Sequence, residues 1–257
     1  MPYIENPKTK GSGIYAAIPQ TGLCPNKCPE CFYQNGRSYL EPLEKNLPNI
    51  PQENFLVGTD RIVRVNDGHD SYFLFPSELD LIIRTAHGRL FFNTSIPIHL
   101  DKYCEKDNPK HLYPVVLTVN PGDFTDRDFH QLDPIPPNLM FVRVRVTMWN
   151  LKLVDDVINY YAAKEVPIVL TFMAYADQQA IPEGQRLHYT YRTRTLNPYW
   201  AITTQAYLDV MDYYRLNKWV YSCGKIEGAQ GDTHCRFCGN CVREYHNTME
   251  RLEMLKP

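Results

Sequence analysis

Six short runs rich in β-branched and aromatic residues recur along this chain, and they constrain its fold more than any other feature. Each ends in turn-forming residues, as strands do. Helical patterns separate some of them, at residues 76–87, where Ser77 is the expected N-cap, and at residues 153–165. Strands that alternate with helices predict a parallel α/β fold, either a partial barrel or an open doubly wound sheet. The six runs are residues 13–20, 61–66, 89–95, 114–120, 141–149 and 166–175.

Polar and apolar side chains alternate within these runs. In the fifth run, Val142 and Val144 share one face, while Arg143 and Arg145 share the other. The second, fourth and sixth runs alternate in the same way. In a barrel the apolar face would meet the outer helices, and the polar face would line an interior suited to a polar ligand. An antiparallel sheet with one wet face would give the same alternation and stays open as an alternative.

Seven of the eight cysteines fall in two groups, within residues 24–31 and 223–241, and only Cys104 lies apart. No apolar run approaches the length of a membrane span, and the N-terminus carries no signal-peptide core. We therefore expect a cytoplasmic protein with no membrane partner. Structural disulfides are rare in that compartment, so grouped cysteines indicate metal binding or redox chemistry.

The first group, Cys24, Cys28 and Cys31, has the spacing C-x3-C-x2-C directly after the first strand-like run. A structural zinc site needs four ligands, usually as paired C-x2-C knuckles. Three closely spaced thiolates instead suit three corners of a [4Fe–4S] cluster, which leaves the fourth iron open to an external ligand. The sequence thus favours a cluster over zinc at these cysteines.

C-x3-C-x2-C at the end of the first strand resembles the signature of radical S-adenosylmethionine (radical SAM) enzymes. The resemblance implies a partial (β/α)6 barrel over residues 1–178, with SAM bound to the open iron. It also implies oxidoreductase chemistry, in which reductive cleavage of SAM yields a 5′-deoxyadenosyl radical that abstracts hydrogen from a substrate. The position before the third cysteine, often aromatic in that family, is Glu30 here, and Tyr33 follows as a candidate cofactor contact. The local sequence is also similar to activases of glycyl-radical enzymes, which lack that aromatic residue.

The resemblance further implies which residues would contact SAM. The turn after the second strand would receive the amino group, the fourth strand would approach the ribose, and an arginine of the fifth would bind the carboxylate. The matching residues are Asn66, Asp67, Gly68, Thr118, Asn120, Arg143 and Arg145.

Residues 179–257 are predicted to form a small cysteine-rich C-terminal extension. It begins with an irregular linker, continues as a helix over 198–216 and ends as a charged helix over 242–255. Between the two helices, Cys223, Cys235, Cys238 and Cys241 have the spacing C-x11-C-x2-C-x2-C. That spacing resembles ferredoxin-type ligation and indicates a second [4Fe–4S] cluster, with zinc as the alternative.

Together these features predict a radical SAM enzyme that takes electrons from a donor such as flavodoxin or ferredoxin. The substrate would be a small molecule or a peptide. The formal net charge of −2 argues against a nucleic-acid partner. Three other functions stay open: a glycyl-radical-enzyme activase, a non-catalytic zinc-binding interaction module, and a ferredoxin-like electron carrier.

Overall fold

The computed structural model describes residues 11–17, 24–26, 28, 60–66, 69–120, 132–194, 197–227, 232–234 and 238–256. Within these residues the largest sheet has seven strands, and all of its neighbouring strands pair in parallel. The strands of this main sheet are β1 (Ile14–Ala17), β2 (Ile62–Val65), β3 (Leu90–Thr94), β6 (Val115–Val119), β7 (Leu139–Val146), β8 (Ile168–Phe172) and β12 (Val220–Ser222).

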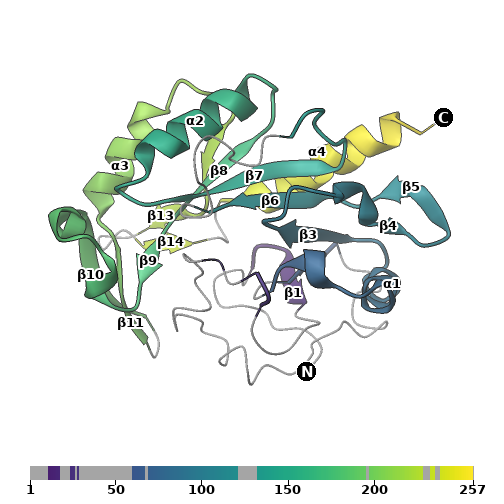
Figure 1. Ribbon diagram of the computed structural model, residues 1–257, viewed down its shortest axis with the longest axis horizontal. Helices are drawn as coiled ribbons and strands as arrows, with labels where there is room; N and C mark the ends of the chain where they lie inside the picture. Colours follow the sequence, from purple (N-terminus) through teal and green to yellow (C-terminus); the bar gives the residue numbers. More distant parts are fainter. Residues whose placement is uncertain are drawn as a thin grey trace.

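The strands follow the order β1-β2-β3-β6-β7-β8-β12, and the main sheet curls into a half-barrel (Figure 1). The prediction of a parallel α/β fold is therefore confirmed, and each of the six runs overlaps one strand of this sheet, although β7 begins two residues before its run. The sequence did not predict the last strand, β12, which comes from the expected C-terminal extension and pairs with β8. It is only three residues long and precedes Cys223, so it carries too little pattern to be recognised.

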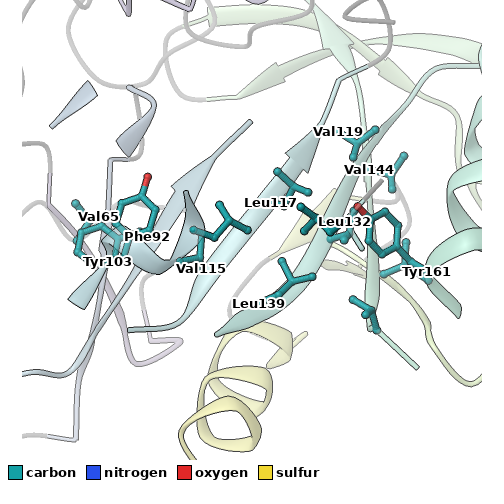
Figure 2. Close-up of a cluster of buried hydrophobic side chains, with 14 of the residues drawn as sticks. Val65, Phe92, Tyr103, Val115, Leu117, Val119, Leu132, Leu139, Val144 and Tyr161 are labelled. Atoms are coloured by element: carbon teal, nitrogen blue, oxygen red, sulfur yellow. The ribbon is translucent and has the colours of Figure 1, made fainter. Parts of the chain in front are cut away.

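Of the described helices, α1 (Pro76–Thr85), α2 (Leu151–Ala162) and α3 (Thr204–Tyr213) cover the outer face of the main sheet. Val142 and Val144 of β7 lie in the same buried apolar layer as Val157 and Tyr161 of α2, as the strand alternation predicts. Figure 2 shows part of this outer layer, with Val115, Leu117 and Val119 of β6, Val144 of β7 and Tyr161 of α2.

The first helix begins one residue earlier than its expected cap. Pro76 occupies the first turn, where its missing N–H costs nothing, and the Glu78 carboxylate accepts the Phe75 N–H at 2.9 Å. Ser77, expected as the N-cap, therefore lies inside the helix.

The link from β3 to β6 is a hairpin of β4 (Cys104–Glu105) and β5 (Asn108–Leu112). No α-helix lies between Thr94 and Val115, a stretch that is described throughout. The described strands and helices therefore do not alternate one for one, as an ideal (β/α)6 barrel would require.

A second sheet follows β8. It joins β9 (Ala174–Tyr175), β10 (Tyr189–Arg194) and β11 (Asn197–Ile202) in antiparallel pairs. The helix predicted over 198–216 is therefore wrong in its first third, because residues up to Ile202 belong to β11. Thr203 is the N-cap of α3, and its hydroxyl accepts the Ala206 N–H at 3.2 Å. A third, short hairpin joins β13 (Lys225–Glu227) and β14 (Asp232–His234).

The terminal helix α4 (Asn240–Met254) confirms the predicted charged helix and packs on the concave face of the main sheet (Figure 1). Tyr245 of α4 lies in a buried cluster with Ile62, Phe91 and Phe141, whose side chains point away from the outer helices. Near the other end of α4, the Arg251 guanidinium donates to the Leu139 carbonyl at 2.6 Å, at the start of β7. The C-terminal helix thus closes the amino-terminal half of the half-barrel interior.

Among the described residues, the structure has no helix with both the length and the apolar character needed to cross a membrane.

Candidate functional site

Cys24 and Cys28 follow β1 at the carboxyl edge of the main sheet, where parallel α/β folds bind their ligands. The Cys24 side chain is buried, and its Sγ accepts the Asp70 N–H at 3.3 Å. The Cys28 Sγ accepts from the Asn26 side-chain amide at 3.2 Å. Both sulfurs therefore face N–H donors, which favour the thiolate form that binds metals.

Asp70 links the cysteine loop to the ends of β2 and β3. Its carboxylate accepts the Ser95 N–H at 2.7 Å, the Ser95 hydroxyl at 2.9 Å and the Tyr72 N–H at 2.9 Å. The Asn26 amide also donates to Asp70, at 3.3 Å, and forms a second bond with Ser95. Cys28 Sγ lies 3.8 Å from the Ser95 hydroxyl oxygen. Three chain segments thus meet at one buried carboxylate.

The polar side chains predicted at the carboxyl ends of β2 and β6 lie on the concave side near the same edge. Asn66, Thr118 and Asn120 are buried. Asn66 has φ of 60°, which turns the chain directly after β2, and its N–H bonds the Ala17 carbonyl of β1. Between them, the Asn93 amide donates to the Val65 carbonyl at 3.0 Å, and Asn93 Oδ1 has no hydrogen-bond partner within the described residues. These groups offer amide and hydroxyl contacts of the kind that fix a polar ligand.

The two arginines of β7 lie at different depths in the half-barrel. Arg145 is nearer the carboxyl edge, in register with Thr171 of β8, and its guanidinium lies 3.7 Å from the Met173 sulfur. Arg143 pairs in register with Thr118 of β6, and its guanidinium carbon lies 5.8 Å from the centre of the Phe141 ring.

The second cysteine group gathers where β12 meets the start of α4. The Cys223 N–H bonds the Leu170 carbonyl of β8, and the Asn240 amide donates to the Ser222 carbonyl at 2.7 Å. Cys223 and Cys241 both pack against the apolar cluster of the concave face. These bonds hold the beginning of α4 against the carboxyl end of β12.

Side chains from several elements affect the pKa of the Cys241 thiol. Burial raises the pKa of its thiol to about 11, while Arg143 and Arg64 lower it and the thiols of Cys223 and Cys238 raise it. The sheet arginines and the three cysteines therefore lie within electrostatic range of one another. A small pocket at the concave face is lined by Ser12, Ile14, Arg64 and residues 238–242.

Several predicted residues lie outside the described part of the chain, namely Cys31, Tyr33, Asp67, Gly68 and Cys235. None of the six described cysteines forms a disulfide bond. Among the described residues, no three Cys, His, Asp or Glu side chains form a group that would hold a metal ion, and each cysteine group lacks one member there. In donor chemistry, the described cysteines of the two groups still fit iron–sulfur ligation, because none forms a disulfide bond, Cys24 and Cys28 face N–H donors, and Cys223 and Cys241 pack against a buried apolar cluster.

Sequence reasoning missed Asn26, Asp70 and Ser95, which join the cysteine loop to the main sheet. Each is a loop residue at or beyond a strand end, and neither period nor spacing marks it. The one available signal is that Asp70 and Ser95 follow adjacent parallel strands, whose ends meet at the same edge.

Compared with known proteins, this chain matches no protein-family model, no curated protein and no solved structure. Any function must therefore be argued from the chemistry of these residues.

Proposed function

We propose that this chain is a radical SAM enzyme whose Cys24, Cys28 and Cys31 hold a [4Fe–4S] cluster at the carboxyl edge of the half-barrel. The observation that carries the proposal is the pair of sulfurs after β1, where Cys24 accepts from the Asp70 N–H and Cys28 accepts from the Asn26 amide, which also donates to Asp70. When bound, the cluster and SAM would supply the electron transfer and carbon–sulfur cleavage that lead to hydrogen abstraction from substrate.

In this mechanism, the residues of the chain would bind and orient the cluster and SAM. Hydrogen bonds to Cys24 and Cys28 would favour the thiolates and fix the loop geometry. Asn66, Thr118 and Asn120 would offer polar contacts to SAM, and Arg145 would pair with its carboxylate. Because most of these groups are buried, water would be excluded from the bound sulfonium.

The proposal includes a second [4Fe–4S] cluster at Cys223, Cys235, Cys238 and Cys241, with zinc as the alternative. Its support is that Cys223 and Cys241 come together on the concave face although 18 positions separate them in the sequence. We further propose a small-molecule or peptide substrate, a flavodoxin- or ferredoxin-type donor, and a cytoplasmic location, where structural disulfides are rare.

Anaerobic reconstitution tests the proposal. The wild-type chain should bind about eight irons, four for each cluster, and form 5′-deoxyadenosine from SAM under reducing conditions. The double variant Cys24→Ala/Cys28→Ala should keep about four irons and lose SAM cleavage. Cys104→Ala, which alters the lone cysteine on β4, is the matched control and should leave both unchanged. Stoichiometric zinc without iron, or SAM cleavage that survives in the double variant, would exclude the proposed function.

A further inference from the structure

Two arginines of the main sheet face the second cysteine group from the concave side. Arg64 of β2 lines the same pocket as Cys238 and Cys241. Arg143 of β7 is in register with Val169 of β8, and Val169 pairs in turn with Tyr221 of β12. Since successive side chains alternate, Arg143, Val169, Tyr221 and then Cys223 share the concave face.

The surroundings of these arginines are largely apolar. Arg64 is 9% exposed, and Arg143 lies next to the Phe141 ring in the cluster that also contacts Cys241. Such surroundings make a positive charge costly unless negative charge lies near it.

We propose that Arg64 and Arg143 are the electrostatic partners of the second cysteine group, where they offset the charge of its metal-bound thiolates and raise the reduction potential of its cluster. This inference rests on the proposed second cluster. It gives Arg143 a role apart from the SAM carboxylate, for which the sequence also suggested it, and leaves that role to Arg145.

The physical reason is the change of charge on reduction. A cluster with four thiolate ligands carries net negative charge, and each added electron makes it more negative. A guanidinium held nearby in surroundings of low dielectric constant stabilises the reduced form more than the oxidised form. Removing one arginine therefore shifts the midpoint potential to more negative values without changing the cysteine ligands.

The test uses full-length chain with Cys24→Ala/Cys28→Ala, so that only the second site holds iron. Arg64→Gln and Arg143→Gln are added singly to this background, and the midpoint potential is measured by an EPR-monitored redox titration. We expect a negative shift for each, and a smaller one for Arg143→Lys, which keeps the charge. Arg84→Gln, a change of the same charge on exposed α1, is the control and should not shift the potential.

The possible outcomes separate the two levels of the proposal. If the background binds iron but both Gln variants keep its potential, the arginine assignment is wrong and the second cluster stands. If the background binds no iron, the second cluster itself is wrong, and the arginine assignment with it. Loss of iron in Arg143→Gln, with iron retained in Arg143→Lys, supports the assignment, because these two variants differ in charge. If both Arg143 variants lose iron, the test rests on Arg64→Gln. A negative shift of its midpoint potential supports the arginine assignment, and an unchanged potential contradicts it.

Discussion

Asp70 is the residue on which the cysteine loop depends. Its carboxylate accepts hydrogen bonds from Asn26, Tyr72 and Ser95, and its own N–H donates to Cys24. Asp70→Asn would replace an acceptor oxygen by an NH2 group facing these donors, so the loop would lose its fixed position. Loss of a partner that orients a ligand typically reduces metal affinity by about 10- to 100-fold. We expect the iron content to fall from about eight toward about four per chain.

The readout for Asp70 must separate positioning from general destabilisation. In the remaining iron-loaded fraction, the EPR spectrum of the first cluster should change less on SAM addition than in the wild type, while the urea midpoint moves little. Asp107→Asn, in the exposed turn between β4 and β5, serves as the control. Normal iron content with a normal SAM response in Asp70→Asn would contradict the positioning role.

Tyr214, at the end of α3, bonds to Asp155 of α2. Its hydroxyl donates to the Asp155 carboxylate, and burial together with this bond raises the Tyr214 pKa, so the hydroxyl stays protonated. A hydrogen bond to a charged group contributes about 1.5–3 kcal/mol. Tyr214→Phe should therefore lower the free energy of unfolding by roughly that amount in urea titrations. Tyr213→Phe, a neighbour 73% exposed, should change it by less than about 0.5 kcal/mol. Equal effects of the two changes would refute the role given to this bond.

At the level of elements, the sequence predicted the strands and helices that a hydrophobic period marks. The runs that contain β2, β6, β7 and β8 place apolar residues on one face and polar residues on the other, and α2 repeats apolar residues at helical spacing, so burial and pattern agree. The error at 198–216 arose because Tyr199 and Trp200 precede a genuine helical repeat, and Pro198 reads as a helix start although it lies in the hairpin strand β11. These residues form a strand because they pair with β10, and that pairing leaves no signal in the local sequence pattern.

The strongest test of the outer layer lies in α2. Ile158 is 2% exposed and packs into the layer that covers β7 and β8. Ile158→Ala should lower the free energy of unfolding by about 2–5 kcal/mol, because the lost methyl groups leave a cavity in a packed core. Asn159→Ala, one residue later on the exposed face of the same helix, should cost less than about 0.5 kcal/mol. Denaturant unfolding followed by far-UV circular dichroism measures both, and a small loss for Ile158→Ala would show that the layer is looser than its burial implies.

Across the whole molecule, the two faces of the main sheet differ in polarity and in what they contact. The outer face is apolar along its length and binds three helices. The concave face is apolar where α4 covers it and polar toward the carboxyl edge, where Asn66, Asn120 and Arg145 lie with the cysteine loop. The sequence indicated the polar interior but not that a C-terminal helix would fill its other half, since contacts between residues so distant in sequence leave no local pattern.

The C-terminal segment therefore bears on whether the chain divides near residue 178. A chain ending at Gln178 would lack β12, α3 and α4, and the apolar side chains that α4 covers, including Phe91 and Phe141, would meet water. Exposed apolar patches of this kind promote aggregation and loosen packing. We expect the shortened chain to bind the dye ANS and to unfold without a cooperative transition, whereas a chain ending at Leu255, just after α4, should behave like the full protein. A cooperative transition with a native-like midpoint in the shortened chain would instead establish residues 1–178 as an independent unit and reduce α4 to an accessory.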